Sequence, residues 1–169
     1  DGSAVVRGRA KGNGGFGTYF PDLYGSKAAF SLGFNNTKTG RMEVSALYYA
    51  ITAIKKDHAV ELIVYSDSEY VVKSFSENRL WKWIDNGWRN SGGSVANIDL
   101  WKPIVQALKD RPSMKLTMKH IRSHQVEKEK DPYKKKVLMR DPNIIGNMMA
   151  DRLADYKRHK TLLDSDKLK

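Results

Sequence analysis

The sequence contains no cysteine among its 169 residues. This absence excludes disulfide scaffolds, zinc–thiolate sites, iron–sulfur clusters and thiol nucleophiles, and it fits a reducing, intracellular compartment. No apolar run approaches the roughly 20 residues that a membrane-spanning helix needs, and no signal peptide is visible. We therefore expect no membrane partner, and the length predicts one domain of ordinary size that builds its core without disulfides.

Acidic residues are scarce relative to basic ones, with 19 Asp and Glu against 30 Lys and Arg and a net charge of +11. The imbalance is uneven: residues 1–100 carry 12 basic and 10 acidic side chains, whereas residues 101–169 carry 18 and 9. Positive charge concentrated in one half suggests a polyanionic partner, most often nucleic acid. A solvated face that keeps the protein in solution is the alternative.

Hydrophobic patterning predicts an α/β domain. Two aromatic-rich runs, Phe16–Phe20 and Ala28–Phe34, predict antiparallel strands after a glycine-rich turn over 8–17. The run Glu61–Ser66 predicts a central strand buried on both faces, and Met114–Ile121 predicts a strand with one buried face. Helical spacing predicts five helices, at 41–56, 70–75, 77–88, 99–109 and 144–159. This order indicates a mixed five-stranded sheet that begins with an antiparallel meander and is flanked by helices.

Four acidic residues lie where an α/β domain commonly places chemistry. Asp67 follows the strand 61–66, and Asp1 precedes the glycine-rich turn. Glu43 lies in the first turn of an apolar helix, and Asp151 lies inside the last helix. Carboxylates without cysteine or clustered histidine favour a hard cation such as Mg²⁺. Two such ions about 4 Å apart activate water and stabilise the leaving oxygen in phosphodiester hydrolysis.

Each of these acids also has a purely structural interpretation. Asp67 would cap a helix, and Glu43 would complement a helix dipole. Asp151 would pair with a neighbouring cation at the surface, and Asp1 would be a frayed terminus. Sequence spacing alone does not show that the four meet.

Six short motifs follow one another along the chain: Asp1-Gly2-Ser3, Arg41-Met42-Glu43, Tyr65-Ser66-Asp67-Ser68-Glu69-Tyr70-Val71, Asn97-Ile98-Asp99-Leu100-Trp101, His120-Ile121-Arg122-Ser123-His124 and Asn147-Met148-Met149-Ala150-Asp151-Arg152-Leu153-Ala154. In this order they resemble the successive motifs of type 1 ribonuclease H. The resemblance implies a ribonuclease H-like fold with the catalytic domain at 1–160 and a tail at 161–169. It also implies an endonuclease that hydrolyses the RNA strand of RNA/DNA hybrids with two Mg²⁺ ions, or Mn²⁺ as a substitute. The products would carry 5′-phosphate and 3′-hydroxyl ends, and the protein would be a monomer.

The resemblance assigns roles by position. Asp1, Glu43, Asp67 and Asp151 resemble a metal-binding quartet, and Glu43 would also touch a ribose 2′-hydroxyl. His124 resembles a mobile-loop histidine that assists proton transfer or product release, with an ordinary exposed histidine as the alternative. All four acids and this histidine are present, which favours an enzyme over a binding domain that has lost catalysis.

Further residues resemble nucleic-acid contacts of the family. A basic protrusion at about 77–96, rich in tryptophan, would hold the DNA strand, because aromatic faces and cations suit a sugar–phosphate groove. Asn97 would grip a DNA phosphate, and Asn147 would lie near the active site or merely start a helix. The remaining expected contacts are Thr39, Gly40, Arg41, Tyr70, Trp81, Lys82 and Arg89.

The sequence departs from the family pattern in two internal places. Lys38-Thr39-Gly40 stands where the family usually has Thr-Asn-Asn, so a phosphate contact from Thr39 and a backbone contact from Gly40 are expected instead. His124 and Asp151 are 27 residues apart, against roughly ten in compact relatives. The inserted lysine-rich loop, about 123–142, is expected either to add an electrostatic grip on the substrate or to be a solvated loop.

The third departure is at the start of the chain. Asp1 is a predicted metal ligand, but the strand that should carry it is missing from the expected elements. A free ammonium beside the site would repel Mg²⁺, so we expect residues before Asp1, in a longer protein. The ribonuclease H region of a larger polyprotein or reverse transcriptase is therefore an alternative to a free-standing enzyme.

Overall fold

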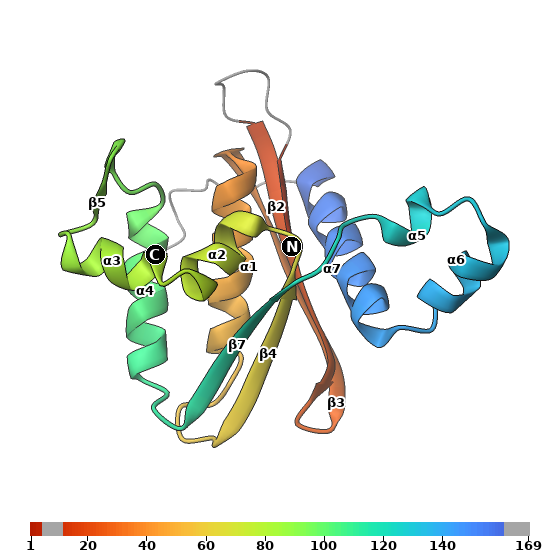
Figure 1. Ribbon diagram of the computed structural model, residues 1–169, viewed down its shortest axis with the longest axis horizontal. Coiled ribbons are helices and arrows are strands. Elements are labelled where there is room, and N and C mark those ends of the chain that lie inside the picture. Colours follow the sequence, from red (N-terminus) through yellow and green to blue (C-terminus); the bar gives the residue numbers. More distant parts are fainter. Residues whose placement is uncertain (5–11, 161–169) are drawn as a thin grey trace.

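The first sheet of the protein is an antiparallel meander. The computed structural model describes residues 1–4 and 12–160 (Figure 1). Strands β1 (Gly2–Ala4), β2 (Gly12–Leu23) and β3 (Ser26–Thr37) pair in that order. The β2–β3 hairpin turns at Tyr24 and Gly25, whose φ angles of 53° and 85° match the twist that a two-residue hairpin requires. The strand expected to be missing is thus present as β1, directly after Asp1.

The second sheet is a parallel pair. Strands β4 (Val60–Ser66) and β7 (Met114–His120) run side by side in register, with Val60 opposite Met114. The four strands whose ranges the sequence predicts are present as β2, β3, β4 and β7, and β1 completes the five expected strands. Among the described residues no ladder joins the meander to this pair, and a cavity of about 320 Å³ lies between β2 and β4.

The position of β4 corrects one expectation. The strand is not buried on both faces: Leu62 is buried, but the neighbouring Ile63 is 42% exposed and Glu61 is exposed. The described part of the chain gives β4 a partner on one edge, β7, whereas its other edge lines the cavity. Alternate residues of β4 therefore face the core and the outside.

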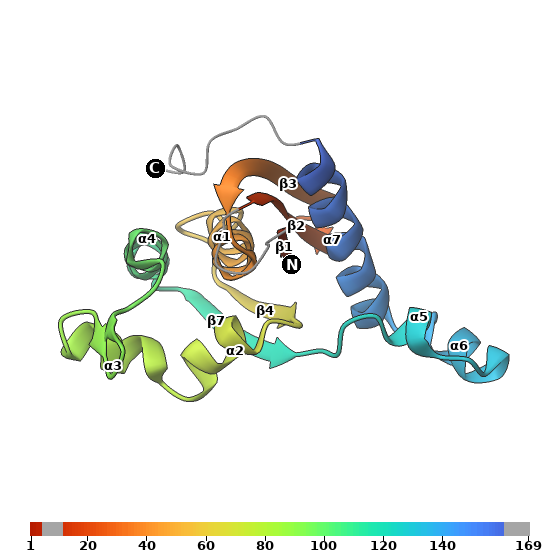
Figure 2. The ribbon, with the colours of Figure 1, turned by 90° about the horizontal axis from the view of Figure 1, so that it is seen from above.

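Helices cover both faces of the meander (Figure 2). Helix α1 (Thr39–Thr52) is buried along most of its length and packs against one face, and α4 (Ile98–Lys109) packs on α1. Helix α7 (Pro142–His159) covers the opposite face so closely that a Cβ atom on Gly17 would lie 2.2 Å from the carbonyl oxygen of Ala150. This close approach explains why positions 15 and 17 are glycine, since a Cβ atom at either would meet α7. Glycines 12, 14, 15 and 17 thus lie within β2 and not in the turn that we expected. Residues 8–11 of that turn, and the tail 161–169, lie outside the described residues.

The main core lies between α1, α4 and the β4–β7 pair, and a smaller one lies between α1 and the meander. Helices α2 (Glu69–Ser76) and α3 (Arg79–Asp85) follow β4 and lead to the hairpin of β5 (Arg89–Asn90) and β6 (Gly93–Ser94). Helix α3 and the β5–β6 hairpin lie in the segment, about 77–96, that the sequence predicts as a basic protrusion. No helix in the described ranges is long and apolar enough to cross a bilayer.

The lysine-rich segment 123–142 is not a continuous loop. It contains two short helices, α5 (Gln125–Lys128) and α6 (Pro132–Leu138). The Asp131 side chain accepts hydrogen bonds from the amides of Tyr133 and Lys134, and Pro132 occupies the first turn. An aspartate at the N-cap followed by proline is a strong helix start, and the sequence analysis above did not use this signal.

Candidate active site

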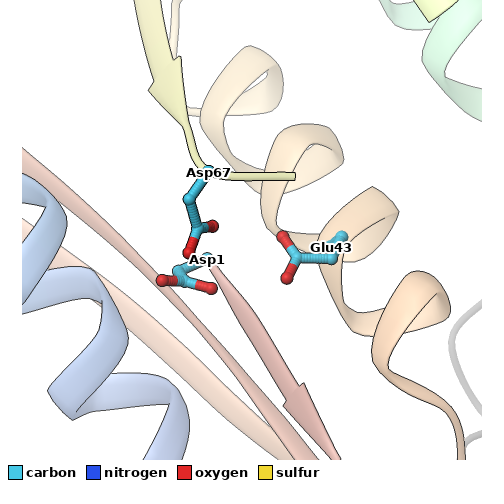
Figure 3. Close-up of side chains that lie close together, drawn as sticks. All are labelled: Asp1, Glu43 and Asp67. Carbon is cyan, nitrogen blue, oxygen red and sulfur yellow. The ribbon is translucent and has the colours of Figure 1, made fainter. Parts of the chain in front are cut away.

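Three of the four acids named above meet at one point. Asp1, Glu43 and Asp67 offer one carboxylate oxygen each, and these atoms all lie within 4.8 Å of one another (Figure 3). The three side chains come from the start of the chain, from α1 and from the end of β4. Their convergence depends on how β1, α1 and β4 pack together.

The backbone around the cluster explains this packing. A Cβ atom on Gly2 would lie 2.3 Å from the amide nitrogen of Glu43, so the absence of a side chain lets β1 lie directly on the first turn of α1. Asp1 extends the β1–β2 pairing, because its ammonium donates to the Gly17 carbonyl at 2.8 Å and the Gly17 amide donates back to the Asp1 carbonyl at 2.9 Å. Asp1 is therefore held in place and is not a frayed terminus.

Asp67 has no capping role in the structure. The N-cap of α2 is Ser68, whose hydroxyl accepts from the Val71 amide. The main-chain carbonyl of Asp67 lies 3.3 Å from Nε2 of His120, and its carboxylate points toward Asp1 and Glu43 (Figure 3). The structural alternative for Asp67, a helix cap, is thus taken by its neighbour.

The environment of Glu43 favours a proton. The pKa of this carboxyl is raised from 4.5 to about 7: burial is the largest cause, the charges of Asp67 and Asp151 also raise the pKa, and the chain's ammonium and the Gly2 amide lower it. Only 8% of the residue is exposed, so Glu43 does not act as a solvated partner of a helix dipole. An acid buried among other acids stays ionised when a cation lies beside it.

The unsatisfied oxygens of the cluster fit a metal ion. Oδ2 of Asp1, Oε2 of Glu43 and Oδ1 of Asp67 are buried and have no hydrogen-bond partner. Buried polar atoms without a partner are costly and therefore rare in native proteins. Three such carboxylate oxygens at one point match the all-oxygen ligand set of a hard divalent cation.

Asp151 lies beside this cluster but outside it. Its Oδ2 is 3.4 Å from Nδ1 of His124, and both side chains are partly exposed. Burial raises the pKa of Asp151, His124 lowers it, and the charges of Asp155 and Asp67 raise it. The structural alternative for Asp151 predicted a surface ion pair with a lysine or arginine, whereas the partner found is a histidine at the start of α5.

Arg41 is engaged by the protein itself. Its guanidinium donates to both carboxylate oxygens of Asp99, at 2.9 and 2.6 Å, and so ties α1 to the first turn of α4. This hydrogen-bonded pair holds the pKa of Asp99 below its usual range. The Arg41 side chain is 16% exposed, so a nucleic-acid contact would use the outer side of this pair. No local sequence pattern marks this pair, because its partners are 58 positions apart.

Tyr70 and the tryptophans form a connected group next to the site. The Tyr70 hydroxyl accepts from Nε1 of Trp101 at 2.8 Å and donates to the Ala96 carbonyl at 3.2 Å. Trp83 packs against Tyr70 and Trp101 and is partly buried. Trp81 is 45% exposed. Of the two tryptophans of α3, it is therefore the one that a ligand reaches more readily.

The other expected contacts are spread around the cluster. Thr39, Lys82 and Arg89 are exposed, and Gly40 lies close to the Tyr70 ring. Asn97 has a left-handed φ of 60° and begins α4 without a side-chain cap, a conformation that asparagine tolerates well.

Asn147 lies on the opposite side of the cluster from these contacts. It occupies the second turn of α7, which starts at Pro142, so it does not start the helix. It lines the cavity between β2 and β4 together with Asp1 and Glu43.

A groove of about 550 Å³ leads away from the cluster and was not predicted. It is lined by Asp67, Glu69, His120, Arg122, Ser123, Gln125, Lys128, Glu129 and Leu138. The signal that could have found it is the motif His120–His124 itself, because a strand that ends beside β4 brings its following residues to the same edge as Asp67.

Comparisons with known proteins agree with this geometry. The ribonuclease H family model matches residues 1–158. The chain is 41% identical over 112 residues to ribonuclease H of Lachnoclostridium phytofermentans, a match that covers 63% of this chain and 68% of that protein.

Two solved structures share the fold at 20% sequence identity. One is LC9-RNase H1, a type 1 RNase H with the type 2 active-site motif, with a TM-score of 0.70 over 96% of this chain and 71% of that one. The other is a foamy viral protease–reverse transcriptase in complex with an RNA/DNA hybrid, with a TM-score of 0.69 over 95% of this chain and 19% of that one. At this identity the likeness concerns the fold.

Proposed function

The chain belongs to the ribonuclease H family, and from this premise we propose that it is a metal-dependent endonuclease that hydrolyses the RNA strand of RNA/DNA hybrids. The observation that carries the proposal is the set of three buried, partnerless carboxylate oxygens on Asp1, Glu43 and Asp67. A domain that only binds nucleic acid has no use for such a costly arrangement. The proposed products carry 5′-phosphate and 3′-hydroxyl ends.

Asp1, Glu43 and Asp67 would hold the divalent cation, with Asp151 as a fourth, more exposed carboxylate beside them. Two bound Mg²⁺ ions, or Mn²⁺ in their place, would activate the attacking water and stabilise the leaving oxygen. The protein's own contribution is to hold the carboxylates in position before the substrate arrives, so that little reorganisation remains for the reaction.

His124 is proposed to move protons at the edge of the site. Its Nδ1 faces Asp151, which leaves Nε2 for water or for the leaving 3′-oxygen. The Asp151 carboxylate next to the imidazole fixes the orientation of the ring. The histidine is about half exposed, so it can exchange protons with solvent between turnovers.

Selectivity for a hybrid requires contacts to both strands. Glu43 is proposed to accept from a ribose 2′-hydroxyl, the group that distinguishes RNA from DNA. Trp81, Lys82 and Arg89 on the protrusion are proposed to hold the DNA backbone, with Asn97 and Thr39 on phosphates nearer the cluster and Tyr70 and Asn147 beside it. The foamy viral relative of this fold binds an RNA/DNA hybrid, which supports the same ligand here.

The first test is cleavage of an end-labelled RNA/DNA hybrid in Mg²⁺, beside single-stranded RNA, duplex RNA and duplex DNA. Hybrid-only cleavage that needs the metal is expected. Asp67→Asn should reduce kcat by at least about 100-fold, because a carboxylate of the cation site is lost, while hybrid binding is kept. The exposed, unrelated Asp22→Asn is the matched control and should cleave like the wild type.

The outcome that overturns the proposal is equally specific. If the wild type binds the hybrid but cuts it in neither Mg²⁺ nor Mn²⁺, the carboxylates do not form a hydrolytic site. Cleavage of single-stranded RNA at the rate of the hybrid would overturn the substrate assignment alone.

A further inference from the structure

The segment 123–141, here called the arm, carries positive charges that form no ion pairs with the described residues of the protein. Its six cations, Lys128, Lys130, Lys134, Lys135, Lys136 and Arg140, are all exposed. Within residues 1–4 and 12–160, no ion pair engages any of them. Clustered like charges repel one another, so an uncompensated cluster of cations favours binding of a polyanion.

The acids of the arm do not neutralise these cations. Asp131 accepts from amides at the start of α6, and Asp141 does the same at the start of α7. Glu129 accepts from the Asp131 amide. Three of the four acids are thus occupied with building the arm.

The arm is folded, yet its outer helix adds only its last residue, Leu138, to a hydrophobic cluster. Val126 of α5 packs with Ile121 and Ile144 in this small cluster, against which Leu138 lies, and the cluster fixes the base of the arm. No residue of α6 is buried, and Tyr133 is 77% exposed. A capped helix that is anchored at one end and leaves its other side chains exposed has a surface available for a ligand.

The position of the arm relates it to the carboxylate cluster. Lys128 and Leu138 of the arm line the same groove as Asp67, so one extended ligand can touch both the cluster and the arm. In both views the arm lies at one end of the molecule's longest axis and α3 lies at the other, with the start of the chain between them (Figures 1 and 2). A duplex that crosses the cluster therefore meets a basic element on each side.

We propose that the arm is a second duplex-binding element, which binds the sugar–phosphate backbone of the substrate hybrid on the side of the carboxylate cluster opposite α3. The inference rests on the proposed function and extends it to the size of the substrate. Three consecutive lysines on one helix point in directions about 100° apart, so their ammonium groups are spread around more than half of the helix circumference. The contact is to phosphates and carries no sequence preference.

The test compares two triple variants that lose the same charge. Lys134→Gln, Lys135→Gln and Lys136→Gln together remove the arm's cluster. Lys27→Gln, Lys55→Gln and Lys109→Gln remove three exposed lysines outside the groove, at the start of β3, after the end of α1 and in the last turn of α4. Both sets are made with and without Asp67→Asn, so that binding is measured without cleavage.

The arm variant is expected to bind a hybrid of about 24 base pairs roughly 10- to 100-fold more weakly at about 0.1 M salt, with a salt slope lower by about 2 to 3. A hybrid of about 8 base pairs offers fewer phosphates to the arm, so the arm variant should lose less affinity for it than for the long hybrid. In the Asp67-containing background, KM for the long hybrid should rise while kcat stays within about twofold. The control triple should lose much less affinity and show the same loss for both lengths.

Equal affinity and equal salt slopes for the arm variant and the wild type on the long hybrid would overturn the inference, as would equal losses for both lengths. If wild-type cleavage of the hybrid persists in that case, the proposed function stands and the inference alone fails. If the wild type neither binds nor cleaves the hybrid, both fail. Unchanged melting temperatures show that both triples are folded, as expected for exposed lysines.

Discussion

Single residues at the carboxylate cluster work against the stability of the metal-free protein. Glu43 is buried beside two other acids, and one oxygen of each acid lacks a partner. The raised pKa of Glu43 is a direct measure of this cost, since burial and like charge both disfavour its ionised form. Proteins keep such arrangements where function needs them and compensate for them elsewhere in the fold.

Removing the charge of Glu43 should therefore stabilise the metal-free protein. The folded-state pKa of about 7 lies above the unfolded value near 4.5. The protonated Glu43 carboxyl therefore costs the folded state nothing below pH 4.5, and the folded protein loses stability relative to the unfolded chain as the pH rises through 7. In a urea titration with a chelator present, the free energy of unfolding of Glu43→Gln is expected to exceed that of the wild type by on the order of 2–3 kcal/mol at pH 8. At pH 4 the two free energies should be equal.

Glu61→Gln is the control for this experiment. The side chain of Glu61 is hydrogen-bonded to Lys115 and Thr117, which lowers its pKa, so its loss should destabilise the protein slightly at pH 8. A Glu43→Gln variant that is less stable than the wild type at pH 8 would contradict the electrostatic explanation.

The same pKa predicts proton release on binding of a divalent cation. Below pH 7 the Glu43 carboxyl is mostly protonated and must lose its proton to become a ligand. Mn²⁺ titration by calorimetry in buffers of different ionisation enthalpy should show about one proton released at pH 6 and almost none at pH 8.5. Glu43→Gln should abolish the release at pH 6, and release that persists in this variant would assign the proton to another group.

At the scale of elements, the contact of α7 with β2 decides where both sit. A Cβ on Gly17 would approach the backbone of α7 to 2.2 Å, and backbone cannot rotate away as a side chain can. Gly17→Ala should therefore push α7, and Asp151 with it, away from the meander. We expect a loss of about 2–4 kcal/mol in unfolding free energy and a larger loss of hybrid cleavage than of hybrid binding.

Gly146→Ala is the matched control, because Gly146 lies on α7, the helix that packs against β2. A Cβ there meets the Tyr19 ring at 3.6 Å, an ordinary contact distance, and the position is inside α7. Alanine should therefore stabilise the protein by about 0.5–1 kcal/mol through helix propensity. If both substitutions change stability in the same direction, the close approach of α7 does not explain the glycines of β2.

Elements with a strong local pattern were predictable from the sequence, and relations between elements were not. The helix at 144–159 and the strand at 114–121 were found almost to the residue, because their apolar spacing is regular. The glycines of β2 resemble a turn until the packing of α7 is known. Helix α6 was not predicted, although Asp131-Pro132 is a local start signal for a helix. Its run of three lysines is equally typical of a solvated loop.

The candidate site divides in the same way. Its acids were recognisable from their motifs, but only the fold shows that three of them meet while Asp151 turns to His124. The Arg41–Asp99 pair joins residues far apart in sequence, with no local pattern to mark it. Long-range contacts are set by tertiary packing, which periodicity does not encode.

At the scale of the whole molecule, helices pack against both the meander and the parallel pair, and among residues 1–4 and 12–160 no strand pairing joins the two sheets. Between β2 and β4 lies the cavity of about 320 Å³, and Asp1 stands at its end. The pairing of Gly2 with Phe16 fixes the register in which anything attached before Asp1 would run along β2, starting opposite Thr18. Such a segment would run parallel to β4, since both end at the carboxylate cluster.

An extension of five alternating valine and threonine residues before Asp1 should therefore fill the cavity and join the two sheets. It supplies backbone hydrogen bonds and buried apolar area, so the melting temperature should rise by at least about 5 °C. Amide exchange should slow at 18–20 of β2 and 61–65 of β4. The extension also turns the Asp1 ammonium, now 2.8 Å from the Gly17 carbonyl, into a neutral amide, which should tighten Mn²⁺ binding. A glycine–serine extension of equal length removes the same charge without filling the cavity. Equal melting temperatures for the two extensions would show that the cavity does not accept a strand.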